Sequence, residues 1–392
     1  MPPFGATRRT RRKAWLQVHL WLGLCAGVVL TIAGITGSVL VFHHEIDEWL
    51  YPQALLVADG GGEAAYRPVA DLQAAAAATL PAAARLAGAT YPRHDGAAFS
   101  FRYAVPSPVG GRDVVQVLVN PYAGTVSGTI TRREAGRLLP ATLVGFMFEL
   151  HYALLAGATG EIILGVFSVA LIFSLLTGLI AWWPLDGKWR RALTIKPGAG
   201  PIRRNYDLHQ MAGFYFLPVL LAVLVSGIYW VLPRQFMAVM HMLSPETVRR
   251  YDVVSADGGS GLISLEDAVR RVRNRFPDGR PSWLYVPNER RPTTYTVCQE
   301  GIAGARFADR RCTVLDARLG RMLHVEEAGR GTAGDTFIAW QWPLHSGQAF
   351  GWPGRILVFL CGLACPLIFV TGYLRWWHKR RARRGKRAIP TP

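Results

Sequence analysis

One stretch of the chain decides its fold, and it reads HYALLAGATGEIILGVFSVALIFSLLTGLIAWW from His151 to Trp183. The same pattern recurs after His345: glycines follow six and nine residues later, then a Thr-Gly pair and a Trp-Trp pair, at identical spacing. Residues 162–181 and 356–374 lie between the last glycine and the tryptophans. They are mostly apolar and long enough to cross a bilayer as a helix. Each copy is therefore a histidine placed just before a predicted membrane helix.

Two further apolar segments, residues 14–44 and 206–232, repeat in the same way. His19, Gly23 and Thr36-Gly37 of the first return as His209, Gly213 and Ser226-Gly227 in the second. The repeated unit is thus a helix, an outer segment and a second helix. Because each unit crosses the membrane twice, both copies enter and leave on the same side. This predicts a parallel repeat with a pseudo-twofold axis along the membrane normal.

The charge pattern predicts which side is cytoplasmic. The chain has 392 residues, half of them hydrophobic, and a net charge of +18 at pH 7. Its basic residues gather beside the apolar segments, in 8–13, 188–204 and 375–387. The positive-inside rule places these groups, and therefore both termini, in the cytoplasm. The basic runs are short and lack interleaved aromatic residues, so we expect no nucleic-acid partner.

The predicted fold is an integral membrane protein with four transmembrane α-helices and two outer α+β modules. The predicted order is tail 1–13, first membrane helix 14–44, first outer module 45–146, interfacial helix and second membrane helix 147–184, loop 185–205, third membrane helix 206–232, second outer module 233–343, interfacial segment and fourth membrane helix 344–377, and tail 378–392. Within the modules we expect a helix at 74–84, broken or kinked at Pro81, and another at 265–276. We also expect turns at 120–124 and 316–320, and strands at 98–105, 114–119, 125–129, 295–298, 312–315 and 321–325.

Two cysteines, Cys298 and Cys312, lie in the second outer module. A disulfide between them is expected only if that compartment is oxidising. Cys25, Cys361 and Cys365 lie inside apolar helices, where a cysteine is most simply a small packing residue.

Four histidines occupy duplicated positions near the membrane, where ionisable residues are costly and usually functional. The pseudo-twofold axis would bring His19 opposite His209 at the cytoplasmic ends and His151 opposite His345 on the outer side. Two facing imidazoles can ligate a haem iron from both sides, which leaves no open site for oxygen. A single histidine at a helix end is more often a capping or interfacial residue, but duplication at fixed spacing favours ligation here.

Two details of this cofactor hypothesis stay open. His43 and His44, at the outer end of the first helix, are alternative ligands for the outer haem. Gly23 and Gly213 follow His19 and His209 by one helical turn, so they would clear space beside a ligand or serve plain helix packing.

The chain resembles the PepSY-associated transmembrane family of bacterial inner-membrane proteins. The matching pieces are His19-Leu-Trp-Leu-Gly23, Thr36-Gly37 with Phe42, Glu45-Ile-Asp47, Glu149-Leu-His151, Thr159-Gly160-Glu161, Asp207-Leu-His209, Leu344-His345-Ser-Gly-Gln-Ala-Phe-Gly351 and Pro353-Gly-Arg355. The resemblance implies periplasmic PepSY-like modules, a role in ferric-siderophore reduction and iron uptake, and binding of haem b. Some relatives carry a cytoplasmic flavodoxin and reductase extension that has no counterpart here, so the electron donor is expected to be separate.

Together these observations predict a di-haem b oxidoreductase of the inner membrane that passes electrons to a periplasmic ferric siderophore and releases Fe(II). Its expected partners are the ferric siderophore, membrane lipid and a donor that is quinol, reduced flavin or a reductase; a homodimer is left open. One alternative is a membrane-anchored PepSY protein that binds or regulates another protein without redox activity. The other is a siderophore or metal transporter, for which more polar residues at the membrane midplane would be expected.

Overall fold

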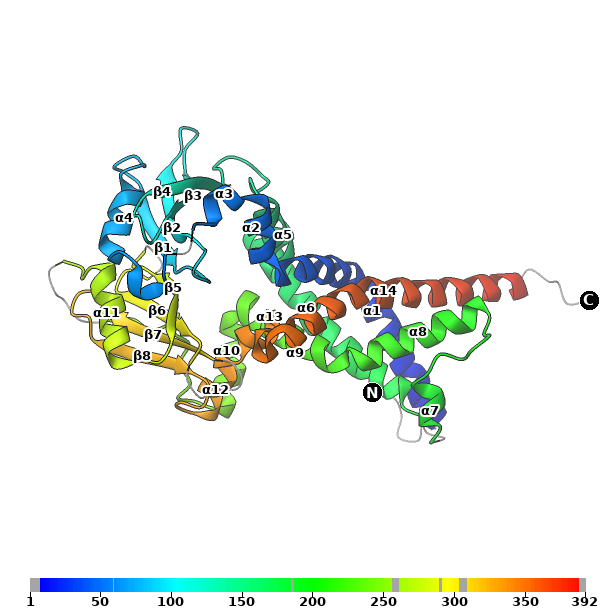
Figure 1. Ribbon diagram of the computed structural model, residues 1–392. Coiled ribbons are helices and arrows are strands. Elements are labelled where there is room, and N and C mark those ends of the chain that lie inside the picture. Colours follow the sequence, from blue (N-terminus) through cyan, green and yellow to red (C-terminus); the bar gives the residue numbers. More distant parts are fainter. Residues whose placement is uncertain are drawn as a thin grey trace, which may run out of the picture. The chain divides into compact units, whose positions relative to one another are not determined.

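The computed structural model describes residues 8–58, 60–184, 187–255, 261–288, 291–302 and 309–387 (Figure 1). Parts of the predicted tails and cytoplasmic loop, residues 1–7, 185–186 and 388–392, lie outside the described residues. The chain forms two compact units, and both halves of the sequence contribute to each. The helical unit is Met1–Val41, Met147–Phe236 and Leu344–Pro392, and the sheet unit is Phe42–Phe146 and Met237–Pro343.

Three helices of the helical unit are long and apolar enough to cross a membrane: α1 (Arg8–Val41), α6 (Gly157–Trp182) and α14 (Gly351–Arg387). The third predicted span differs from a single helix, because α8 (Pro201–Tyr215) and α9 (Leu217–Val231) meet at an angle of 58°. The bend lies where Pro218 enters α9, since proline has no N–H to continue the helical hydrogen bonds. The shorter helices in or beside this unit are α5 (Leu143–Ala153), α7 (Trp189–Ala192), α10 (Pro233–Leu243) and α13 (Gln341–Ser346).

Small residues let the long helices approach closely. α1 packs against α14 and α6, while α8 contacts α14 and α9 contacts α6. Where α1 meets α14, a Cβ added to Gly34 or to Gly362 would overlap the carbonyl oxygen of the other. Such backbone-to-backbone contact is typical of helices that associate in lipid. The outward faces of α6 and α14 expose large apolar side chains, among them Ile162, Val166, Phe173, Ile356, Leu360 and Leu363.

The sheet unit contains one antiparallel sheet of eight strands in the order β4-β3-β2-β1-β5-β6-β7-β8. The strands are β1 (Arg85–Thr90), β2 (Phe99–Pro106), β3 (Arg112–Val119), β4 (Val126–Arg133), β5 (Arg280–Tyr285), β6 (Thr294–Glu300), β7 (Arg310–Asp316) and β8 (Met322–Glu327). The two outer modules, predicted separately, join where β1 pairs with β5 through Ala89–Leu284 and Thr90–Trp283. Six of the strands were predicted; β1 and β5 were missed.

Helices cover one face of this sheet. α4 (Val69–Ala77) and α11 (Leu265–Arg275) pack onto a buried core that includes Phe99, Phe101 and Val117. The prediction of α11 is confirmed, but the bounds of the alanine-rich helix, predicted at 74–84 with a break or kink at Pro81, were wrong. It begins earlier and stops before Pro81, because the residue preceding a proline disfavours helical dihedral angles. The remaining α-helices described for this unit are α2 (His43–Leu50), α3 (Pro52–Leu55) and α12 (Ala333–Ala339), and a short 3-10 helix spans Glu63–Ala65.

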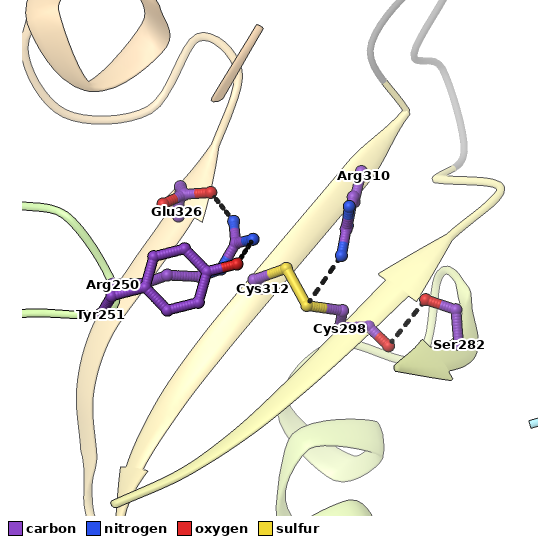
Figure 2. The surroundings of a disulfide bond; sticks show 7 residues. All are labelled: Arg250, Tyr251, Ser282, Cys298, Arg310, Cys312 and Glu326. Atoms are coloured by element: carbon purple, nitrogen blue, oxygen red, sulfur yellow. Dashed lines mark hydrogen bonds and ion pairs between the residues drawn. A yellow bond between two sulfur atoms is a disulfide. The ribbon is translucent and has the colours of Figure 1, made fainter. Parts of the chain in front are cut away.

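Both predicted turns are confirmed, and they have the same chemistry. The side chains of Asn120 and Asp316 each accept hydrogen bonds from the backbone N–H groups two and three residues later. Gly124 and Gly320 then adopt positive φ angles of 75° and 67°, which glycine tolerates without a steric penalty. Beyond these turns, Cys298 of β6 and Cys312 of β7 lie opposite each other and form a disulfide (Figure 2).

Candidate functional site: two histidine pairs

The helical unit brings the four duplicated histidines together as two pairs. The ring centroids of His19 on α1 and His209 on α8 are 6.1 Å apart, with an angle of 67° between the ring planes. Those of His151 on α5 and His345 on α13 are 5.9 Å apart, at 66°. These are the partners that the internal repeat predicts, and the two pairs have nearly the same geometry. We call them the inner pair, His19–His209, and the outer pair, His151–His345.

A backbone carbonyl orients each of the four rings; for His345 it is the carbonyl of Val223. The Nδ1 atoms lie 2.8 Å from the Ser174 oxygen for His19, 2.9 Å from the Ile368 oxygen for His209, and 3.0 Å from the Ala33 oxygen for His151. A carbonyl oxygen only accepts, so Nδ1 carries the proton and donates it. In a neutral imidazole this leaves the lone pair on Nε2, which is the tautomer that binds a metal.

Hydroxyl groups give a second contact to the same ring nitrogen. Thr36 Oγ1 lies 3.1 Å from His151 Nδ1, Thr371 Oγ1 lies 3.1 Å from His209 Nδ1, and Ser226 Oγ lies 2.8 Å from His345 Nδ1. Each of these hydroxyls donates its own proton to a carbonyl one turn back in its helix. The hydroxyl oxygen is therefore free to accept from the histidine, which extends the same tautomer to His345.

The inner pair departs from this pattern at one position. His19 contacts Ser174, whose Oγ lies 3.3 Å from Nδ1, whereas the repeated Thr177 donates to the Ser174 carbonyl instead. Three of the four histidines thus use the repeated hydroxyl, and His19 uses the residue one turn earlier in α6.

Each ring also lies against the glycine that follows a repeated hydroxyl residue. A Cβ added to Gly178 would come within 2.8 Å of His19 Cε1, and one added to Gly37 within 3.0 Å of His151 Cε1. The corresponding distances are 3.1 Å from Gly372 to His209 Cε1 and 3.9 Å from Gly227 to His345 Cε1. The Ser/Thr-Gly dipeptides, which in the sequence are only a sign of duplication, therefore lie directly beside the four histidines in the structure.

Tight turns hold the outer histidines in place. After His151, Leu154 and Leu155 have positive φ angles of 49° and 58°, which cost about 1–2 kcal/mol each for residues with a side chain. The chain then reverses so closely that a Cβ on Gly160 would overlap the Ala153 carbonyl. In the second copy, a Cβ on Gly354 would overlap the Gly347 carbonyl in the same way. This close approach explains the glycine nine residues after each outer histidine.

The residues fit a haem held by two axial histidines. An iron–nitrogen bond of about 2.0 Å on each side corresponds to roughly 6 Å between ring centroids, as found in both pairs. One turn beyond each inner histidine there is also room. A Cβ added to Gly213 would meet no atom of the described residues within 4 Å, and one added to Gly23 would meet only Ser174 Oγ, at 4.0 Å.

A cation accompanies the inner pair. Arg375 of α14 lies close enough for its charge to act on both His19 and His209, and its guanidinium stacks 4.4 Å from the ring centroid of Tyr206. A carboxylate such as a haem propionate could pair with this side chain. Sequence reasoning missed Arg375 because it lies within a long basic run.

The alternative ligands His43 and His44 lie outside both pairs. They begin α2 in the sheet unit, where their ring centroids are 3.9 Å apart. Within the described ranges, no three His, Cys, Asp or Glu side chains gather as a bare metal ion would require.

Comparison with known proteins identifies one family. The family described as the PepSY-associated TM region matches residues 16–379, which is nearly the whole chain and includes all four paired histidines. No curated protein matches the chain.

Proposed function

The chain belongs to the PepSY-associated TM family, and from this premise we propose that it is a haem-containing reductase of the bacterial inner membrane. In this proposal the protein passes electrons across the membrane to a periplasmic ferric siderophore. The observation that carries it is the presence of two matched histidine pairs in one helical unit, each spaced for a haem iron.

The spacing of the pairs along α1 supports electron transfer across a membrane. His19 belongs to the inner pair, and Thr36, seventeen residues later on the same continuous helix, contacts His151 of the outer pair. At about 1.5 Å per residue the two levels are roughly 25 Å apart along the helix. That is most of the thickness of a bilayer's hydrocarbon core, about 30 Å.

Haem b, held on both faces by histidine, would supply one-electron transfer without an open site for oxygen. The residues around the four histidines would orient them as ligands for this haem. Hydrogen bonds from Nδ1 to carbonyl and hydroxyl oxygens raise the basicity of each imidazole and fix its orientation. The glycines beside the histidines let the rings pack directly against the helix backbone.

The proposed reaction transfers one electron to each ferric ion. Fe(II) is held less strongly than Fe(III) by hard oxygen ligands, so reduction releases iron without destroying the chelator. In this proposal the electron donor is quinol, a reduced flavin or a reductase.

The proposed topology has four spans, with α8 and α9 together forming the third. Both termini and residues 185–205 are cytoplasmic, and the sheet unit is periplasmic, where the Cys298–Cys312 disulfide would persist. Single cysteines introduced at Gly60 and Gly198 test this orientation in intact spheroplasts. An impermeant thiol reagent should label Gly60→Cys and spare Gly198→Cys; the opposite result reverses the orientation.

The function is tested in two steps. Purified protein should show a low-spin haem b spectrum with a split α-band on reduction by dithionite; colourless protein would favour a binding or regulatory role.

In liposomes with reductant trapped inside, external ferric siderophore should be reduced, with Fe(II) captured by a ferrous chelator as the haems reoxidise. If prereduced haems stay reduced with every ferric siderophore offered, the substrate assignment is wrong.

A further inference from the structure

The sheet unit carries a group of basic and aromatic side chains on the face opposite α4 and α11. Because side chains alternate along a strand, Arg102 lies on that open face between the core residues Phe101 and Tyr103, and Tyr285 lies there between Leu284 and Val286. Arg250, Tyr251, Arg291 and Arg310 surround these two residues. We call the six the arginine–tyrosine cluster; Figure 2 shows part of it beside the disulfide.

The two tyrosines form its centre. Their ring centroids are 6.4 Å apart, with the planes nearly perpendicular. The guanidinium of Arg250 lies 4.5 Å from the ring centroid of Tyr251 and donates to the Tyr251 hydroxyl. Arg291 lies 5.0 Å and 5.4 Å from the ring centroids of Tyr251 and Tyr285.

Arg310 extends the cluster towards the disulfide. Its Nη2 lies 3.5 Å from Cys298 Sγ, and its guanidinium lies 5.9 Å from the ring centroid of Trp342. The buried Nε of Arg310 has no hydrogen-bond partner among the described residues. A buried N–H donor left without an acceptor is costly, so this group favours an incoming oxygen atom.

Among the described residues, positive charge exceeds negative charge in the cluster. Glu326 forms an ion pair with Arg250. For the described part of the chain, no carboxylate forms an ion pair with Arg102, Arg291 or Arg310. Burial raises the pKa of Glu300, near Arg310, above its usual value, which disfavours its charged form.

The electrostatic effect of this excess is visible at Tyr285. Burial alone would raise the pKa of its hydroxyl, but the charges of Arg250, Arg310 and Arg102 and a hydrogen bond with Tyr251 outweigh burial, so the pKa is lowered. Stacking of guanidinium groups on aromatic rings is favourable, yet it leaves the positive charge uncancelled. An anion bound here would offset that charge.

We propose that the arginine–tyrosine cluster binds an anionic, catecholate-type ferric chelate. Guanidinium groups bind paired oxygens in a planar fork and also stack on aromatic rings, so they can hold a catechol both by its oxygens and by its ring. The ligand class rests on the proposed function for its iron, whereas the preference for an anion with aromatic oxygen donors comes from the cluster itself.

A redox-inert probe separates this site from the electron-transfer proposal. Gallium(III) takes the place of Fe(III) without accepting an electron, so binding to the full-length oxidised protein can be measured by calorimetry in detergent. A trianionic gallium tris-catecholate should bind at least about tenfold more tightly than a neutral gallium tris-hydroxamate, and its affinity should fall as salt is added. Inorganic phosphate, the third probe, should not compete at equal concentration; competition would identify a general phosphate site and overturn the assignment.

Arg102→Gln and Arg291→Gln test the residues. Neither side chain is fully buried or ion-paired within the described ranges, so both variants should fold and keep their histidine sites. Each should weaken tris-catecholate binding by roughly tenfold. The matched control is Arg270→Gln, the same loss of charge on an exposed residue of α11, which should leave the affinity within about twofold.

The outcomes distinguish the two proposals. If both variants bind like the unaltered protein while ferric chelates are still reduced, the cluster is not the binding site. If the variants lose binding but the protein contains no haem, the site stands and the reductase proposal fails.

Discussion

Both copies of the repeat place the same side chains around the histidines, whereas the two halves of the sheet share strands but differ in side chains. A Ser/Thr-Gly dipeptide stands beside every paired histidine. In the sheet, Arg102 faces Gln116 across β2 and β3. When the two turns are aligned, Arg102 and Gln116 correspond to Cys298 and Cys312, which face each other across β6 and β7.

The difference follows from how each half is used. In the helical unit each copy contributes one histidine to each pair, so both copies must satisfy the same geometry at a shared centre. In the sheet unit the two halves meet along the β1–β5 edge and where α4 contacts α11, on one face of the sheet. Their open faces are not required to match, and one half could acquire the disulfide and most of the arginine–tyrosine cluster.

The strongest test of the shared centres removes one histidine. His19→Ala should abolish the inner haem and transmembrane electron transfer, because its partner His209 alone provides one axial ligand. The outer haem should remain, so the haem content measured as the pyridine haemochrome should fall from two per chain to one. His378→Ala, which changes a histidine outside both pairs, is the control. Retention of two low-spin haems in His19→Ala would show that the pairing is wrong.

A second test fills the space beside the inner pair. In Gly213→Leu, no described atom would lie within 4 Å of the new Cβ, so the apoprotein should fold normally. If a haem lies one turn from His209, the new side chain should exclude most of the inner haem and leave the outer one. The outer haem is thus the internal control, and full occupancy of both would place the macrocycle elsewhere.

A third test addresses a residue that only the second half of the sheet has. Arg311 is buried and donates to Glu327 and Asp278, whereas the equivalent position of the first half is the core residue Val115. Arg311→Leu should lower the free energy of unfolding by about 3 kcal/mol, because Asp278 loses its ion-pair partner and Glu327 keeps only Arg330. Arg137→Leu, which breaks an exposed pair, should cost less than about 1 kcal/mol in the same denaturation measurement.

The Arg311 effect should depend on pH. Hydrogen bonds from Arg311 hold the pKa values of Glu327 and Asp278 below the usual carboxyl range. Their contribution is therefore present above the unfolded-state pKa values and is lost as the pH falls through the lowered folded-state values. The stability gap between the unaltered protein and Arg311→Leu should shrink in acid; a constant gap would assign the effect to packing.

The smallest effect is expected when one of the hydroxyl groups that contact a histidine is removed. Thr36→Val removes the oxygen that accepts from His151 Nδ1 while keeping the side-chain shape, and the Ala33 carbonyl contact remains. A less basic imidazole stabilises Fe(III) less, so the outer haem potential should rise by about 40 mV, the one-electron equivalent of about 1 kcal/mol. Thr31→Val is the control, since that hydroxyl binds the Gly27 carbonyl in its own helix. Equal potentials in both variants would mean that the hydroxyl does not tune the site.

Local pattern was enough to predict most elements of this protein. Apolar length predicted α1, α6 and α14, and spacing of the repeat predicted which histidines meet. Turn chemistry at Asn120 and Asp316 located the strands on either side. These features depend on residues close in sequence or on strict duplication, so they can be predicted from a single sequence.

Contacts between distant residues were decided by the tertiary structure alone. The short strands β1 and β5, the latter containing Pro281, have no strong local signal and become strands because they pair with each other and join two modules into one sheet. The role of the Ser/Thr-Gly dipeptides also appears only in the folded protein. There α6 contacts His19 and α1 contacts His151, although each histidine is more than a hundred residues away in the sequence. Sequence spacing determined that the histidines are equivalent; packing determined which carbonyl, hydroxyl and glycine each one meets, because such contacts depend on helix positions in space.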